Sequence, residues 1–328
     1  MNIKTISDIA KIAGVAKSTV SRYLNGGSVS GATKKKLEKV INETGYIPNP
    51  FAQSLKAKKT NMIGTIVPRL DSYATSHTLI GIDEQLKAQN YQMIIANTSQ
   101  SIEREIESIY HFANQKVDAI ILLATVITEA HIKAFEVART PVIMIGQEHE
   151  KFHCVIHDDY GAGFEIGNYL LAKGHRKIAY LGVTENDIAV GVKRKQGFFN
   201  AMKSRQHCEV KYFETGFSIH SAIMEATSIL DEYDPTIFVC ATDNIALGVC
   251  KVVYQKGYKI PADISVTGFG GYEITEVIHP SLTTVQFYYK EAGEKAAKMI
   301  IELLQDKEVP KLSISKFKII ERESVDSL

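Results

Sequence analysis

The chain has 328 residues, of which 45% are hydrophobic and 23% are charged, and its formal net charge at pH 7 is +1. This composition excludes a disordered or fibrous protein and is typical of a globular protein with two or three domains. No run of 18 apolar residues is present and no apolar core of a secretory signal is visible, so we expect a cytoplasmic protein without membrane contact. The four cysteines form no CxxC pair and are interpreted as reduced thiols.

The small net charge conceals a division along the chain. Residues 1–60 hold 11 Lys or Arg and 3 Asp or Glu, which gives +8, whereas the remaining residues hold 27 and 34, which gives −7. A small basic segment joined to a larger acidic body indicates that the basic segment meets a polyanion. Charge alone leaves open the alternative of a basic surface without a partner.

Three short helices are predicted in the basic segment. The first, SDIAKIAG, has apolar residues at helical spacing, a cap at Thr5 or Ser7, and an end at Gly14. The second covers about residues 17–25 after a very short turn, and the third, KKKLEKVINETG, ends at Gly45. Two helices joined by a tight turn and supported by a third predict a helix-turn-helix domain.

The second predicted helix has a polar face. Ser18, Ser21, Arg22 and Asn25 fall at i, i+3, i+4 and i+7, and Lys17 lies at the leading edge of this face. Such a face is either simply solvated or shaped to contact phosphates and base edges.

From Met62 onward, short apolar runs alternate with helical segments, which is typical of parallel sheets covered on both faces. The runs are too numerous for one sheet and favour two sheets side by side. The predicted strands are MIGTIVP, YQMIIANT, VDAIILLA, PVIMIGQ, HCVIHDD, KIAYLGV, VKYFET, PTIFVCA, DISVTGF and a final KLSISKFKIIERES. The predicted helices cover about 76–89, 101–115, 128–139, 160–173, 191–204, 219–232, 243–257 and 290–306.

A linker rich in proline joins the two regions. Pro48 and Pro50 exclude a continuous helix, but NPFAQSLKA can form one short helix with Asn49 as its cap and Pro50 at its first position. A helix of about seven residues is marginal alone in water, so the segment is either a plain linker or an element that folds on a surface. The lysines that follow it indicate that this surface is negative.

The whole chain resembles the lactose/galactose (LacI/GalR) repressors of bacteria. The resemblance is carried by TISDIAKIAGVAKSTVSRYLN, GYIPNPFAQSL, KGHRKIAYLG, KRKQGFFNAM, ATDNIALG, DISVTGFGG and PSLTTV, in the order of the family. It implies an α/β protein with a small all-α head and a body like the periplasmic binding proteins, made of two doubly wound subdomains. The implied division is a helix-turn-helix domain at 1–48, a hinge at 49–60 and an effector-binding and dimerisation domain at 61–328, with a subdomain boundary near 158–162 and crossovers near 285–292 and 318–324.

The resemblance also implies the residues that meet DNA. Lys17, Ser18 and Arg22 are expected to reach base edges in the major groove, where a guanidinium can bind guanine through two hydrogen bonds. Leu55 is expected to wedge between base pairs in the minor groove, or otherwise to pack on the body, and Ala52 to let two hinge helices of a dimer approach. The remaining expected DNA contacts, mostly to phosphates, are Thr5, Ser7, Thr19, Ser21, Asn25, Asn49 and Lys56.

A ligand is expected in the cleft between the two subdomains. The resemblance places the loop RLDSYATS there, together with Arg194, whose guanidinium can bind two neighbouring hydroxyls, and Phe217, whose ring can stack on a sugar. The full set of expected effector contacts is Asp71, Tyr73, Gln147, Arg194, Phe217, Thr242, Asp243 and Tyr289. For Tyr73 and Tyr289, ordinary packing is the alternative.

The chain departs from the family pattern at two places. Ala16 stands where the family usually has a serine that caps the recognition helix, a loss that typically costs about 1 kcal/mol. Gly270 and Gly271 stand where many relatives have an acidic residue, so Asp71, Gln147 or Asp243 is expected to supply the missing hydroxyl acceptor. The sugar cannot be identified in this way, although RLDSYA and GFGGYE look most like sucrose-operon repressors.

The motifs of common enzymes are missing from the sequence. It contains no GxxxxGK[ST], no HExxH and no GxSxG, and Asp158 and Asp159 are interpreted as a helix N-terminus rather than an acid/base pair. We therefore expect no enzyme, no catalytic residue, no metal and no cofactor. The expected function is a dimeric repressor that binds a palindromic operator and responds to a small sugar or sugar phosphate. The alternatives are a sugar-binding protein without a DNA role, a sugar kinase, an activator, or a regulator that needs a corepressor, including a phosphoprotein.

Overall fold

The computed structural model describes residues 4–24, 26–46, 59–203 and 208–328, and the chain forms two compact units, residues 1–61 and 62–328. The first unit contains the helices α1 (Ile6–Ala13), α2 (Lys17–Leu24) and α3 (Gly31–Thr44). Ile9, Val20 and Leu37, one from each helix, are completely buried and form the centre of its core. The helix-turn-helix domain expected from the sequence is therefore present.

The ends of these helices follow from local chemistry. The Thr5 hydroxyl accepts the N–H of Asp8 (3.3 Å) and the backbone N–H of Thr5 donates to the Asp8 carboxylate (2.8 Å), which closes a capping box at the start of α1. Gly14 and Gly45 end α1 and α3 with a φ of 60°, a left-handed conformation that glycine adopts without strain. Ser30 caps α3 through the N–H of Thr33.

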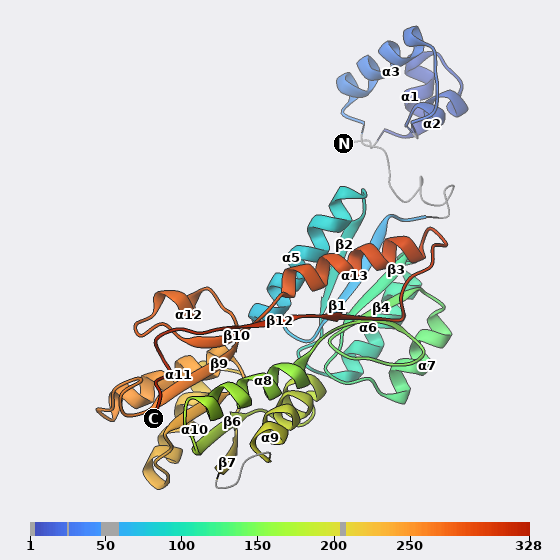
Figure 1. Cartoon of the computed structure of the whole chain (residues 1–328). Coiled ribbons are helices and arrows are strands. Elements are labelled where there is room, and N and C mark those ends of the chain that lie inside the picture. Colours follow the sequence, from blue (N-terminus) through green and yellow to red (C-terminus); the bar gives the residue numbers. More distant parts are fainter. Residues whose placement is uncertain (1–3, 25, 47–58, 204–207) are drawn as a thin grey trace. The chain divides into compact units, whose positions relative to one another are not determined.

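The second unit contains two six-stranded sheets (Figure 1). The first sheet has the order β11-β5-β4-β3-β1-β2, and all of its strand pairs are parallel. Helices α5 and α13 pack on one face of it, and α6 and α7 pack on the other. The elements of this first subdomain are β1 (Met62–Val67), α5 (Tyr73–Ala88), β2 (Gln92–Asn97), α6 (Ile102–Asn114), β3 (Ala119–Leu123), α7 (Glu129–Ala138), β4 (Val142–Ile145), β5 (His153–His157), α13 (Tyr289–Leu303) and β11 (Leu312–Ser315).

The second sheet has the order β12-β10-β9-β8-β6-β7 and is parallel except for β12, which runs antiparallel to β10. Its faces are covered by α8 and α9 on one side and by α10 and α11 on the other. The elements of this second subdomain are α8 (Asp159–Ala172), β6 (Lys177–Gly182), the π-helix η1 (Ile188–Arg194), α9 (Lys195–Lys203), β7 (Glu209–Glu214), α10 (Ile219–Glu232), β8 (Ile237–Cys240), α11 (Asp243–Gln255), β9 (Ser265–Gly270), α12 (Ile274–Val277), β10 (Thr283–Phe287) and β12 (Phe317–Ile320).

The chain passes between the sheets at three points. It leaves the first sheet after His157, returns to it at Tyr288, and leaves it again at Lys316 between β11 and β12. The resemblance implied a third crossing near 318–324, and Lys316 lies two residues before this range. Ser315 is the last residue of β11 and Phe317 the first of β12, so a single residue separates strands that belong to different sheets.

The fold class predicted from the sequence is confirmed, but two elements were not predicted. Strand β10 was missed because Thr, Thr and Gln interrupt its apolar pattern, although four of its five residues are buried. Helix α12 has four residues, which is too short for a periodic pattern. Within the described ranges, none of the helices has both the length and the apolar character needed to cross a bilayer.

Candidate nucleic-acid and effector sites

One exposed face of α2 carries the side chains that the sequence predicts for base contacts. Lys17, Ser18 and Arg22 are exposed, whereas Val20 of the same helix is completely buried. The N–H of Gly27 donates to the carbonyl of Arg22 (2.8 Å), and a Cβ at position 27 would lie 2.6 Å from the Arg22 side chain. The helix therefore presents two cations and a hydroxyl on a support that is fixed by apolar packing.

The expected phosphate contacts lie in different surroundings. Ser7 is exposed, and Thr19 and Ser21 are half-buried. The Thr5 hydroxyl is used in the cap of α1. The hydrogen bond from the Thr5 N–H, followed by the one from its hydroxyl, holds the pKa of the Asp8 carboxyl below its usual value. The predictions for Asn25, Asn49, Ala52, Leu55 and Lys56 lie outside the described residues.

Ala16 precedes α2, as the sequence indicated. Its carbonyl accepts the N–H groups of Thr19 (2.9 Å) and Val20 (3.3 Å), so the backbone begins the helix here. The side chain of alanine has no oxygen that could bind the first free N–H groups of the helix, and α2 therefore begins without a hydroxyl cap from this residue.

A cavity lies between the two sheets of the second unit, with about 890 Å³ of empty space when the part open to solvent is counted. Its walls are built by the segments that follow the carboxyl ends of parallel strands, such as Arg69 after β1, Gln147 after β4 and Thr242 after β8. Open α/β sheets bind ligands at this edge.

A buried ion pair forms part of the cavity wall. Nε and Nη2 of Arg194 donate to Oδ1 of Asp159 (3.0 and 2.5 Å), and Nη1 donates to the carbonyl of Ala241 (2.5 Å). Both charged side chains are about 5% exposed, and the guanidinium lies over the rings of Phe269 and Phe287. These bonds use three of the five N–H groups of Arg194.

Other polar groups of the cavity lack partners within the described part of the protein. Gln147 is 5% exposed and its Nε2 has no hydrogen bond, and the same is true of Nδ1 of His157. Burial lowers the pKa of His157 and raises the pKa of Asp187, whose carboxylate accepts the N–H of Val190 (2.9 Å) at the start of η1. Buried donors and acceptors without partners are costly, and a polar ligand can satisfy them.

The residues that line the cavity include the aromatic residue Phe217. The Arg69 guanidinium carbon lies 4.5 Å from the centroid of the Phe217 ring, so a loop of the first subdomain meets a loop of the second. Tyr289 also lines the cavity, as does Thr242, whose hydroxyl caps α11 through the N–H of Ile245 (3.3 Å). Five of the eight predicted effector residues therefore lie in one cavity: Gln147, Arg194, Phe217, Thr242 and Tyr289.

Asp71 and Tyr73 are not among the residues that line this cavity. The Asp71 side chain is 83% exposed and pairs with Arg69 (3.8 Å). The Tyr73 ring is stacked between His77 and Tyr272, with centroid distances of 3.8 and 4.1 Å. Both residues were predicted because they belong to RLDSYATS. Helix α5 begins within this segment, and successive side chains there point in different directions.

Asp243 also lies behind the cavity wall rather than in it. It is completely buried, accepts the N–H of Tyr272 (2.8 Å) and the hydroxyl of Thr284 (2.6 Å), and its burial raises the pKa to about 6. These bonds fix the glycine turn after β9, so Asp243 does not supply the acceptor that was expected to replace an acidic residue at positions 270–271.

Sequence reasoning missed several polar residues of the cavity, among them His157, Asp159, Asp187 and Gln100. Asp158 does cap α8 through the N–H of Gly161 (2.8 Å), as the interpretation of a helix N-terminus requires. The adjacent Asp159 points instead to Arg194, which is 35 residues away in the sequence. Its position directly after a buried strand was the available signal, since strand ends gather at the ligand edge of a sheet.

Comparison with known proteins settles the family. A model of the bacterial regulatory proteins of the lacI family matches residues 5–49, and a model of a periplasmic binding protein-like domain matches residues 168–325. The sucrose operon repressor of Staphylococcus xylosus is 41% identical over 305 residues, which cover 92% of this chain and 94% of that protein. The chain belongs to the LacI family.

Other LacI-family proteins are similar over the full length. The HTH-type transcriptional repressor PurR of Vibrio atlanticus (strain LGP32) is 31% identical and covers 99% of both chains. A crystal structure of the lac repressor dimer bound to operator and the anti-inducer ONPF superimposes with a TM-score of 0.91 over 99% of both chains, at 23% identity, which supports the fold. The resemblance inferred from the sequence is confirmed, and this LacI-family chain is a DNA-binding transcription regulator rather than an enzyme.

Proposed function

We propose that the protein represses a carbohydrate-utilisation operon, and that a small sugar or sugar phosphate in the cavity sets its affinity for DNA. The observation that carries the proposal is the pair of unpartnered polar atoms, Gln147 Nε2 and His157 Nδ1, in the wall of a cavity between two sheets. Buried polar groups are normally hydrogen-bonded, so unpartnered polar atoms in a cavity wall favour a polar ligand as their partner.

The chemistry of the cavity suits a ligand rich in hydroxyls. Each hydroxyl donates one hydrogen bond and accepts others. Asp159 and Asp187 offer acceptors, Arg194 and Gln147 offer donors, and the Phe217 ring offers an apolar face for the C–H side of a sugar. Groups from both subdomains take part, so a bound ligand stabilises one arrangement of the two relative to the other.

For DNA, we propose that Lys17, Ser18 and Arg22 contact base edges in the major groove and that two heads of a homodimer read the halves of a palindrome. The minor-groove role of Leu55 and the close approach at Ala52 remain part of this proposal. Such a regulator works on the bacterial chromosome, hence in the cytoplasm.

The effector acts through linkage. A sugar that binds more tightly to the arrangement with low DNA affinity lowers operator occupancy, and the operator lowers sugar affinity by the same factor. A corepressor has the opposite preference.

The test is a titration of the purified protein with a fluorescent palindromic operator that the protein itself selects from random DNA. Sucrose, fructose, glucose and their 6-phosphates are then added at constant operator concentration. A fall in operator affinity with one of them supports the proposal. A rise assigns the ligand as a corepressor, and sugar binding without any DNA binding contradicts the regulatory function.

A further inference from the structure

A buried polar cluster lies in the first subdomain, behind the cavity wall. It consists of Thr98, Glu105, Thr128 and His131 and is called here the Glu105 cluster. Glu105 is 2% exposed and His131 is completely buried, and no member of the cluster is among the residues that line the cavity. Buried ionisable pairs are rarely the most stable way to fill a core, so their retention calls for a reason beyond stability.

The hydrogen bonds of the cluster have fixed directions. The backbone N–H of Thr128 points at Nδ1 of His131 (3.2 Å), and this N–H can only donate. Nδ1 is therefore an acceptor, the ring proton lies on Nε2, and Nε2 donates to Oε2 of Glu105 (2.9 Å). The Thr128 hydroxyl also lies 2.9 Å from Nδ1.

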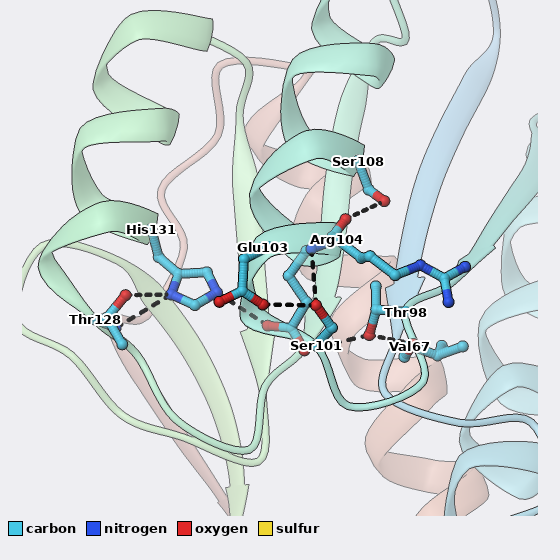
Figure 2. Close-up of polar contacts among 9 residues, drawn as sticks. Val67, Thr98, Ser101, Glu103, Arg104, Ser108, Thr128 and His131 are labelled. Carbon is cyan, nitrogen blue, oxygen red and sulfur yellow. Dashed lines mark hydrogen bonds and ion pairs between the residues drawn. The ribbon is translucent and has the colours of Figure 1, made fainter.

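The other carboxylate oxygen of Glu105, Oε1, lies near the carboxyl ends of β1 and β2. The Thr98 hydroxyl lies 3.4 Å from Oε1 of Glu105 and 3.2 Å from the carbonyl of Val67, and its single proton can be donated to either of these acceptors. Figure 2 shows Thr128 and His131 at one end of this chain of bonds and Thr98 and Val67 at the other. The cluster thus joins α6 and the start of α7 to the carboxyl ends of β1 and β2.

The segment after Thr98 is strained. Ser99 and Gln100 have φ values of 53° and 62°, and neither is a glycine. Consecutive left-handed residues of this kind cost energy and persist only where their surroundings hold them. The N–H of Gln100 donates to the carbonyl of Pro68 (2.8 Å), and this turn brings Gln100 to the cavity wall.

A second set of bonds holds the same turn from its exposed side. The Arg104 guanidinium donates to the carbonyl of Asn97 (3.0 Å) and to the hydroxyl of Ser99 (3.2 Å). Ser101 caps α6 through the N–H of Arg104 (3.2 Å). The turn is therefore fixed at its start by the buried cluster and along its outer edge by α6.

We propose that Gln100 is a specificity-determining contact for the effector, and that Glu105 and His131 are positioning residues that set the strained turn on which Gln100 stands. This proposal rests on the proposed effector function of the cavity. Apolar side chains would fill the same space, but their contacts are not directional and would not fix the position of the turn. The hydrogen bonds of the Glu105 cluster are directional and therefore fix it.

The test compares Gln100→Ala, Glu105→Gln and Thr98→Val with a matched control, Glu107→Gln. Glu107 lies on the same helix as Glu105 but is exposed. Operator release is titrated with the panel sugar that is active on the wild type. We expect the first three variants to need roughly tenfold more sugar, with unchanged operator affinity in its absence, and the control to match the wild type.

Two further measurements separate positioning from general stability. If Glu105 acts through Gln100, the double variant Q100A/E105Q needs no more sugar than Q100A alone, whereas additive losses overturn the proposal. Hydrogen exchange in residues 97–101 is expected to quicken in E105Q and T98V but not in E107Q, and equal exchange in all of them also overturns the proposal. Should the wild type respond to no sugar, the proposed function fails, and the exchange comparison still decides whether the cluster sets the turn.

Discussion

Arg194 and Asp159 come from different helices of the second subdomain and form a buried pair, with Nη2 of the arginine 2.5 Å from Oδ1 of the aspartate. Removal of either partner leaves the other charge buried, which costs about 3–5 kcal/mol. We expect R194M and D159L each to unfold at clearly lower urea concentration, and the double variant R194M/D159L to recover part of the loss. Urea unfolding of all four proteins measures this, and additive losses would contradict a coupled pair.

A variant at Gln147 can separate effector binding from the stability of the free protein. Because its Nε2 is buried without a partner, Gln147→Met removes an unsatisfied donor at little change in volume, and the free protein is expected to be equally or more stable. The same variant is expected to bind the effector roughly tenfold more weakly. Thermal unfolding with and without the active sugar shows both effects. A large loss of stability in the free variant would mean that the amide serves the fold instead.

Arg22 is expected to contribute to sequence discrimination. Replacing it with alanine removes an exposed side chain, so the head should remain folded while operator affinity falls by about 1–3 kcal/mol. Lys39→Ala is the matched control, because Lys39 is an exposed cation that pairs with Glu43 on α3 (3.8 Å). Fluorescence anisotropy with the selected operator and a shuffled duplex distinguishes them. Equal losses on both duplexes would show that Arg22 contacts only the backbone of DNA.

Asp243 gives the body a pH-dependent stability. Its pKa is raised by burial from 3.8 to about 6, so the folded state holds the proton more tightly than the unfolded state. The stability that it contributes is therefore complete below about pH 4 and is lost as the pH rises through about 6. Relative to D243N, the wild type is expected to lose roughly 2–3 kcal/mol between pH 4 and pH 7. Urea unfolding of both proteins at several pH values checks this, and a constant difference would refute it.

Much of the architecture could be predicted because it depends on local patterns. The helix expected over 219–232 agrees with α10, since a serine cap and apolar spacing define it within one segment. Strand β10 could not be found in this way. Its Thr283 and Thr284 are buried because Arg322 and Asp243 satisfy their hydroxyls, and both partners lie about 40 residues away.

Residues of the candidate site could be predicted from the sequence where their position along a helix or strand determines the direction of the side chain. Gln147 lies at the end of a strand and enters the cavity, whereas Asp71 and Tyr73, near the start of a helix, point elsewhere. The pairing of Asp159 with Arg194 depends on how α8 and η1 pack together, and this packing has no signature in either segment alone.

The three passages of the chain between the sheets determine how the body fails when it is shortened. A stop codon after residue 288 removes α13 and β11 from the first sheet and β12 from the second. One nonsense mutation therefore uncovers hydrophobic surface on both halves at once. Neither half can be recovered as an intact fragment from a single uninterrupted stretch of the gene.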